Sequence, residues 1–261
     1  MTTTLDIQRN GPVARVYLNR PDVRNAFNEG VVAELGAAFT GFAADASLRA
    51  IVLGGHGKAF CAGADLSWMR EMAGYTWEQN RADAQALADM LWAVWRCPVP
   101  VVGRIHGDCY AGGVGLASVC DVLVVADGVN FCLSEAKLGL LPGTISPYVI
   151  RAMGEQASRR YFVTAERFSA AQAHTMGFVH ELCAADRLDA KVDEIVAALV
   201  ANGPMATRAC KKLVQDVAGL PIDETLRAET ARRIADIRAS DEGKEGVQSF
   251  LNKRKPAWLL D

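Results

Sequence analysis

The sequence lacks long apolar segments: no stretch approaches about 18 continuous apolar residues, the length that a membrane-spanning helix needs. Residues 1–10 are polar and lack the basic start and apolar run of a secretion signal, so a cytoplasmic protein is expected. There is also little excess charge. The formal net charge is −2, with both signs interspersed, and neither nucleic acid nor a membrane is expected as a partner.

Cysteine and histidine do not occur in the spacings of a metal site or a disulfide framework. The seven cysteines are scattered and form no C-x-x-C pair, and the four histidines form no H-E-x-x-H motif. A metal site is therefore not expected, and most cysteines are expected to be small buried hydrophobic residues.

Several catalytic and nucleotide-binding motifs are missing as well. No G-x-S-x-G occurs, so serine hydrolysis has no support. Gly57-Lys58 is followed by alanine, and no glycine lies five positions earlier, so there is no P-loop. A dinucleotide-binding fingerprint is only weakly matched, because residues 113–118 end in Ser118 where the third glycine belongs.

What is present indicates a globular α/β protein. The 261 residues are 51% hydrophobic and 22% charged, enough to bury a sizeable core. Strand patterns alternate with helical ones, which predicts a largely buried sheet. The expected elements are a hairpin of strands 5–8 and 13–18, helices from Glu29, at 76–95 and at 116–120, and strands at 48–54, 99–105, 122–126 and 130–133.

Beyond about residue 185 only helical patterns remain, at 186–201, 204–217, 224–239 and 242–251. The first and third each carry an apolar face, and few partners for these faces are left in the main body. A subunit interface is therefore a reasonable hypothesis. We expect a core at residues 1–195 and a helical oligomerisation region at residues 196–261.

Two glycine-rich turns, at residues 57–66 and 107–115, each follow an apolar strand and lead toward a helix. Small residues allow a ligand to approach the backbone, and N–H groups at a helix start are unpaired. Together the turns can direct two N–H groups at one oxygen, as an enolate or oxyanion requires. The alternative for either turn alone is tight strand-to-helix packing.

Glu135 is the acidic residue that attracts most attention. It lies between an apolar strand that ends at Leu133 and the glycine-containing turn at residues 139–143, with few other charges nearby. Two interpretations remain open from the pattern alone: a helix cap, or a catalytic acid/base.

Read together, four ordered segments resemble the crotonase (enoyl-CoA hydratase/isomerase) family along essentially the whole chain. They are 20–27 (RPDVRNAF), 62–66 (AGADL), 106–121 (HGDCYAGGVGLASVCD) and 134–143 (SEAKLGLLPG). The resemblance implies a spiral of ββα units followed by a helical C-terminal region that builds trimers, often paired into hexamers. It also implies an acyl-CoA thioester as substrate, with no cofactor other than the coenzyme A of that substrate.

By position, the resemblance implies an oxyanion hole made by the backbone N–H groups of Ala64 and Gly112. Acyl-CoA is expected to contact a set of residues along the two turns and the segment before them, with the tail of a neighbouring subunit completing the pocket. This set comprises Arg24, Asn25, Ala26, Ala62, Asp65, Leu66, Trp68 and Gly115, together with Phe250 and Lys253 of the tail. On its own, the basic cluster at 253–255 is read as a solvated tail.

The resemblance also carries a departure. Hydratases of the family typically use two glutamates, of which the second matches Glu135, whereas the first falls on Gly115. A single carboxylate is the arrangement of the family's isomerases. The flanking residues nevertheless look most like the branch that hydrates 3-methylglutaconyl-CoA in leucine breakdown, so we favour hydration. Double-bond isomerisation and non-catalytic acyl-CoA binding remain the alternatives.

Overall fold

The computed structural model describes residues 4–259 and contains two sheets. The larger sheet is parallel except for its first pair, β1 and β2, which form the predicted hairpin around Gly11. In spatial order its strands are β1 (Leu5–Asn10), β2 (Val13–Leu18), β3 (Ala50–Gly55), β5 (Val101–Ile105), β7 (Val122–Ala126) and β10 (Glu181–Cys183).

The smaller sheet consists of four three-residue strands. They are β4 (Ala59–Cys61), β6 (Asp108–Tyr110), β8 (Asn130–Cys132) and β9 (Arg167–Ser169), and only β9 runs antiparallel to its neighbour. The pairs β3–β4, β5–β6 and β7–β8 each place one strand in each sheet, and each is followed by helical structure. This repetition is the spiral of ββα units that the resemblance implied.

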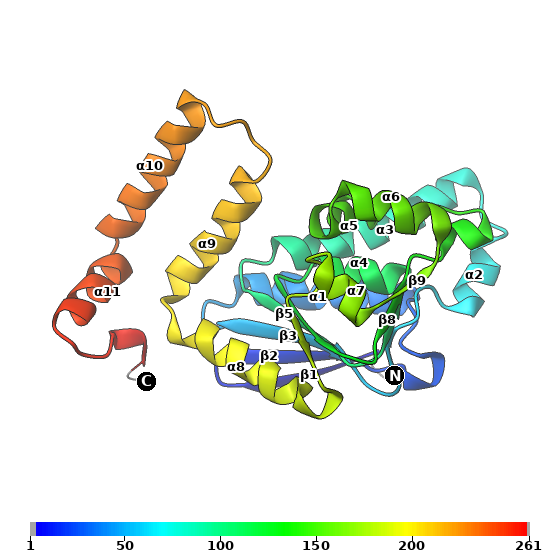
Figure 1. Ribbon diagram of the computed structural model, residues 1–261, viewed down its shortest axis with the longest axis horizontal. Coiled ribbons are helices and arrows are strands. Elements are labelled where there is room, and N and C mark those ends of the chain that lie inside the picture. Colours follow the sequence, from blue (N-terminus) through cyan, green and yellow to red (C-terminus); the bar gives the residue numbers. More distant parts are fainter. Residues whose placement is uncertain (1–3, 260–261) are drawn as a thin grey trace.

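Helices cover the sheets (Figure 1). The longest two in the core, α1 (Glu29–Ala44) and α3 (Trp77–Arg96), pack side by side and begin at side-chain caps from Asn28 and Thr76. The others are α2 (Leu66–Met72), α4 (Gly112–Ser118), α5 (Ser146–Met153), α6 (Glu155–Thr164) and α7 (Ala170–Thr175). Within residues 4–259, no helix has the length and apolar character needed to span a membrane.

The helix expected at 116–120 begins earlier, at Gly112, and ends at Ser118. Gly112, Gly113 and Gly115 of the second turn are therefore helical, whereas Gly107 lies just before β6. Their low helix propensity is outweighed by close packing, since a Cβ atom at Gly113 would lie 2.7 Å from the carbonyl oxygen of Cys61. Cys61, Cys97, Cys109 and Cys132 are buried, as expected for most cysteines, and all seven cysteines are free.

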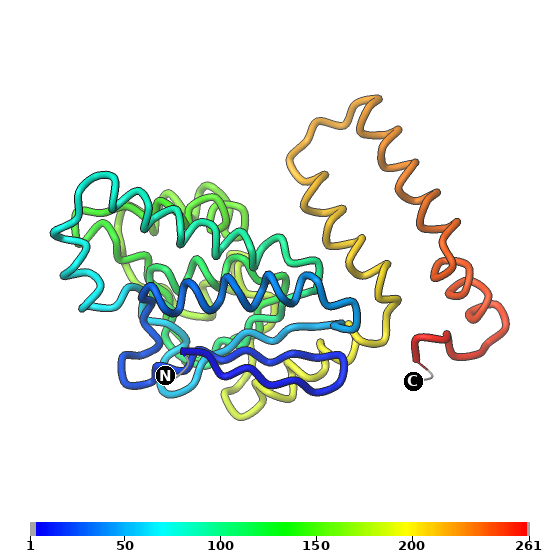
Figure 2. Tube along the Cα trace, turned by 180° about the vertical axis from the view of Figure 1, so that it is seen from behind, coloured from blue at the N-terminus to red at the C-terminus, as the bar shows by residue number. Residues whose placement is uncertain are grey.

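After β10 the chain is helical, as predicted. The helix α8 (Leu188–Ala201) packs on the larger sheet through Leu188, Val192 and Val196, so the boundary expected at residue 195 falls inside it. The following helices form a hairpin that extends beyond the core (Figure 2): α9 (Pro204–Val217), α10 (Glu224–Ala239) and α11 (Asp241–Leu251). Residues 1–3 and 260–261 of the two expected regions lie outside the described residues.

Candidate active site

The two glycine-rich turns lie next to each other because β4 and β6 are parallel neighbours. Cys61 pairs with Cys109, and Ala64 and Gly112 each come three residues after these partners, at the same edge of the sheet. The turns touch: a Cβ atom at Gly63 would lie 2.9 Å from Cβ of Ala111. Glycine is required at this position, which also has a φ of +91°.

A short bridge to Phe27 sets the direction of the Ala64 N–H group. The Phe27 N–H donates to the Gly63 carbonyl at 2.7 Å, and its carbonyl accepts from the Asp65 N–H at 2.8 Å. Residue 64, opposite Phe27 in this parallel bridge, directs its own N–H away from Phe27. Within the described part of the chain this N–H has no hydrogen-bond acceptor, so it is available to a ligand.

The Gly112 N–H is available for a different reason. Gly112 is the first residue of α4, so its N–H has no partner within the helix. The preceding Ala111 has φ 47° and ψ −118°, a conformation that costs an alanine roughly 1–3 kcal/mol. The Ala111 N–H donates to the Cys132 carbonyl at 2.7 Å, which holds this strained residue against the next strand.

Glu135 lies at the same edge of the small sheet, on the next strand connection. Strand β8 is parallel to β6, Tyr110 pairs with Cys132, and Glu135 opens the 3-10 helix η2 (Glu135–Leu138) three residues later. Its Oε2 atom is buried and has no hydrogen-bond partner among residues 4–259. Burial raises the pKa of the Glu135 carboxyl.

The helix-cap interpretation of Glu135 does not hold. The cap position of η2 is Ser134, and no side chain there makes a capping hydrogen bond. A buried carboxylate without a partner is destabilising, and such groups are concentrated at functional sites. The arrangement therefore offers two N–H donors for an oxygen that gains negative charge and one acid/base for a proton.

The space next to Gly115 is filled by Ile145, a residue that the sequence analysis did not single out. Gly115 lies one turn beyond Gly112 on α4, and a Cβ atom on it would be 2.6 Å from Cβ of Ile145. Ile145 is 2% exposed, and its carbonyl accepts the N–H groups of Tyr148 and Val149. Residue 115 therefore supplies no second carboxylate, and any side chain at this position would overlap Ile145.

The residues predicted to bind CoA in segment 24–26 and along the first turn differ in the exposure of their side chains. Arg24 and Leu66 are exposed, so their side chains are accessible to a ligand. The buried side chains of Asn25 and Asp65 make hydrogen bonds inside the protein. The Ala62 N–H donates to the Arg24 carbonyl at 3.0 Å, which places the two segments side by side.

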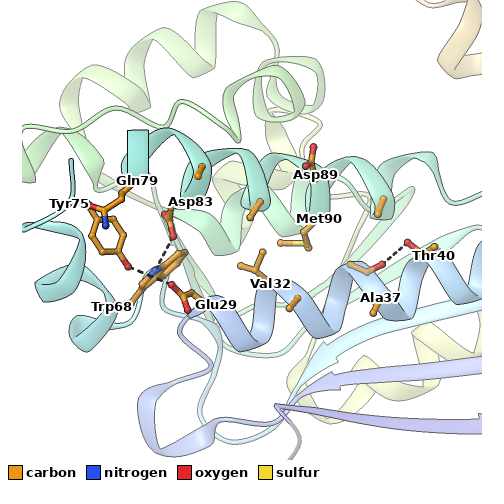
Figure 3. A pocket seen from close by; sticks show the side chains of 15 residues that line it. Glu29, Val32, Ala37, Thr40, Trp68, Tyr75, Gln79, Asp83, Asp89 and Met90 are labelled. Atoms are coloured by element: carbon orange, nitrogen blue, oxygen red, sulfur yellow. Dashed lines mark hydrogen bonds between the residues drawn. The ribbon is translucent and has the colours of Figure 1, made fainter. Parts of the chain in front are cut away.

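Trp68 is buried and belongs to a cavity of about 750 Å³ between α1 and α3 (Figure 3). Its indole Nε1 donates to Oδ1 of Asp83 at 3.1 Å. Burial raises the pKa of the Asp83 carboxyl. Neither turn donor nor Glu135 lines this cavity. The Trp68 indole lies beside Asp83 between α1 and α3 (Figure 3).

Phe250 and Lys253 lie at the end of the helical hairpin. Phe250, on α11, is 82% exposed, and Lys253 follows that helix in a left-handed conformation. In Figure 1, α11 is on the side of the hairpin far from the sheets. Within one chain these residues are therefore not brought to the two turns.

Comparisons with known proteins agree with this geometry. The sequence profile described as "Enoyl-CoA hydratase/isomerase" matches residues 8–259. An enoyl-CoA hydratase from Alternaria alternata is 34% identical over 256 residues, covering 97% of this chain and 83% of that protein. A carnitinyl-CoA dehydratase from Salmonella typhi is 28% identical over 271 residues, covering 99% of each.

Solved structures agree as well. The crystal structure of an enoyl-CoA hydratase from Shewanella pealeana superposes with a TM-score of 0.94 at 40% identity, covering 98% of this chain and 96% of that one. The match extends through the ββα spiral and the C-terminal helices. The chain therefore belongs to the crotonase, or enoyl-CoA hydratase/isomerase, family.

Proposed function

We propose that this protein adds water across the 2,3 double bond of an enoyl-CoA thioester. The observation that carries the proposal is the buried, unpartnered Oε2 of Glu135 at the sheet edge where the Ala64 and Gly112 N–H groups also lie. Relatives named as hydratases and as a dehydratase support a reaction that adds or removes water.

In the proposed reaction, Glu135 acts as the only acid/base. Its carboxylate takes a proton from water while the water oxygen bonds to C3, and the π electrons of the double bond move to the thioester oxygen. The two backbone N–H groups stabilise the resulting enolate, a contribution of roughly 3 kcal/mol per donor in other enzymes. The protonated Glu135 then returns the proton to C2, which restores the carboxylate.

Isomerisation of the double bond is the second candidate, and the Gly115–Ile145 contact favours it. One carboxylate is sufficient to remove a proton at C4 and return it at C2 through a dienolate stabilised by the same two N–H groups, and no water molecule needs to be held. Because Ile145 fills the space beside Gly115, a water molecule for hydration would have to be held by other groups or by the substrate.

A substrate carboxylate can supply that role, and for this reason we propose 3-methylglutaconyl-CoA or a related branched enoyl-CoA as substrate. Residues 112–116, 131–135 and 145–148 look most like the branch that hydrates such esters. The proposed CoA contacts within one subunit are those expected at residues 24–26 and along the first turn, among which Arg24 has an exposed cationic side chain.

We also propose a homotrimer or homohexamer in which α11 of a neighbouring subunit brings Phe250 and Lys253 to the CoA site. The hairpin α9–α11 extends beyond the core and exposes apolar side chains, among them Ile222 at 87% and Phe250 at 82%. The proposed enzyme is cytoplasmic and needs no cofactor besides the CoA of its substrate.

The test is to incubate the protein separately with 3-methylglutaconyl-CoA, a 2-enoyl-CoA and a 3-enoyl-CoA. Mass spectrometry detects added water, and absorbance detects migration of the double bond. Hydration that is lost in Glu135→Gln, with CoA-ester binding retained, is the expected result. Migration without hydration would establish the isomerase instead, and the absence of both reactions would favour a non-catalytic acyl-CoA binder.

A further inference from the structure

Arg20 connects the two segments that meet at Ala64. Its Nη1 donates to the Ala26 carbonyl at 2.6 Å, and its Nη2 donates to Oδ2 of Asp65 at 2.7 Å. Ala26 immediately precedes Phe27, and Asp65 immediately follows Ala64. One guanidinium therefore holds both segments beside the Phe27–Ala64 bridge.

This bridge is short, which is why an additional tie matters. It consists of one isolated residue pair with two backbone hydrogen bonds, one on each side of residue 64. A rotation of this pair would change the direction of the Ala64 N–H group. The Arg20 guanidinium, called the Arg20 fork below, joins the same two segments through the neutral Ala26 carbonyl and the charged Asp65 carboxylate. Because the guanidinium is itself charged, both hydrogen bonds are charge-assisted, and such bonds are roughly twice as strong as neutral ones.

The fork is itself held in place. The Arg20 side chain is 21% exposed and the Asp65 side chain 8%, so water competes little for the pair. The Arg20 N–H donates to Oδ1 of Asn25 at 2.9 Å. Oδ1 of Asp65 accepts the Ser67 N–H at 2.8 Å, which caps α2, and this bond together with Arg20 holds the pKa of Asp65 below its ordinary value.

We propose that Arg20 is a positioning residue for the oxyanion hole, because its contacts with Ala26 and Asp65 fix the direction of the Ala64 N–H. This inference rests on the proposed function in one respect: it takes Ala64 as a donor to the thioester oxygen. Arg20 does not contact the substrate in this role. Its effect reaches the thioester only through residue 64.

The sharpest test measures polarisation of the thioester carbonyl without any turnover. Butyryl-CoA labelled with ¹³C at the carbonyl is saturated and cannot be hydrated. Its carbonyl stretch in the infrared should shift to lower frequency when it binds to the unaltered protein. The shift should be reduced in Arg20→Met and in Asp65→Asn, and retained in Arg9→Met.

Arg9 is a matched control because it forms an ion pair of 3.0 Å with Asp45 at the opposite end of the β1–β2 hairpin. Melting temperatures identify any variant that has lost its fold. If Arg20→Met does not fold, Asp65→Asn remains as the test, because it keeps the hydrogen bond of the Arg20 side chain to the Ala26 carbonyl. A full shift in folded Arg20→Met or Asp65→Asn would overturn the proposal, as would the absence of a shift in the unaltered protein.

The kinetic readout is a separation of kcat from KM. Small misplacements of a catalytic group can cost about 10²-fold in rate. We expect kcat to fall by at least 10-fold in Arg20→Met, with the affinity for CoA esters changed much less, and Arg20→Lys to recover part of kcat through one of the two contacts. Equal losses in kcat and affinity would contradict a positioning role. If the unaltered protein polarises butyryl-CoA but hydrates no enoyl-CoA, the proposed function fails while this inference stands.

Discussion

Lys211 of α9 donates a hydrogen bond of 2.6 Å from Nζ to Oδ2 of Asp121, the residue before β7. The Lys211 side chain is 6% exposed, and the same Asp121 oxygen also accepts the Val101 N–H at 2.7 Å. Burial raises the pKa of Asp121, so its carboxylate depends on the cation of Lys211 for stabilisation. This pair fastens the helical hairpin to the larger sheet.

We expect Lys211→Met to lower the free energy of unfolding by about 2 kcal/mol, because it leaves the partly buried carboxylate of Asp121, 28% exposed, without its cation. Urea denaturation followed by circular dichroism measures this change. Lys212→Met is the control: Lys212 is 58% exposed and pairs with Asp216 at 2.7 Å, so its loss should cost less than about 1 kcal/mol. Equal losses in the two variants would show that Lys211 does not anchor the hairpin.

Glu135→Gln should stabilise the fold above mildly acidic pH. Burial raises the pKa of Glu135 in the folded state above its ordinary value of 4.5. Below 4.5 the folded and unfolded states both hold the proton, so the two proteins should differ least. As pH rises through the interval up to the raised pKa, the unfolded state loses its proton first, and the unaltered protein alone loses stability.

Melting temperatures of the two proteins between pH 4 and 8 test this expectation. The advantage of Glu135→Gln should grow with pH and then level off. A difference that shrinks as pH rises would mean that the folded pKa is lowered, in disagreement with an unpartnered carboxylate.

Gly63→Ala should reduce activity more than its effect on stability explains. Both Gly63 (φ +91°) and Gly219 (φ +81°) have conformations that cost an alanine roughly 1–2 kcal/mol. Only at Gly63 would the added Cβ meet another turn, 2.9 Å from Cβ of Ala111, whereas nothing lies within 4 Å at Gly219. We therefore expect a lower kcat on enoyl-CoA for Gly63→Ala but not for Gly219→Ala. Equal kcat values in these two variants would show that activity does not require the close contact between the turns.

Gly115→Ala should destabilise the protein although alanine favours helices. Overpacking against Ile145 costs typically 1–3 kcal/mol. Gly41→Ala, inside α1 with nothing within 4 Å of the new Cβ, should instead stabilise by about 0.5–1 kcal/mol. In a double-mutant cycle, Ile145→Ala should cost less when Gly115 is already alanine. Additive costs would argue against direct contact between the two residues.

Much of the fold could be predicted because its longer elements carry strong local patterns. The hairpin around Gly11, the core helices α1 and α3 and the helices after residue 185 all appear within a few residues of their predicted limits. The three-residue strands of the smaller sheet, apart from β8, were not predicted. A strand of this length shows no alternation, and its stability comes from neighbours far away in sequence, as in the pairing of Cys61 with Cys109.

For the site, the sequence located Ala64, Gly112 and Glu135, and the structure places all three at one sheet edge. Arg20, Phe27 and Ile145 were not recognised as contributors. Arg20 lies in a segment quoted for the resemblance, but nothing local connects it with Asp65, 45 residues away. The contact of Ile145 with Gly115 likewise has no sequence signal, because an apolar residue before a helix is common in any core.

The sequence by itself therefore determined which chemical groups are present: two glycine-rich turns, one isolated glutamate and a glycine at residue 115. These follow from residue type and local spacing. Only the tertiary structure decided how those groups are directed and what surrounds them: the Ala64 N–H turned away from Phe27, Oε2 of Glu135 buried without a partner, and the space at Gly115 filled by Ile145. Each of these depends on contacts between residues distant in the chain, whose geometry is set by the packing of the two sheets.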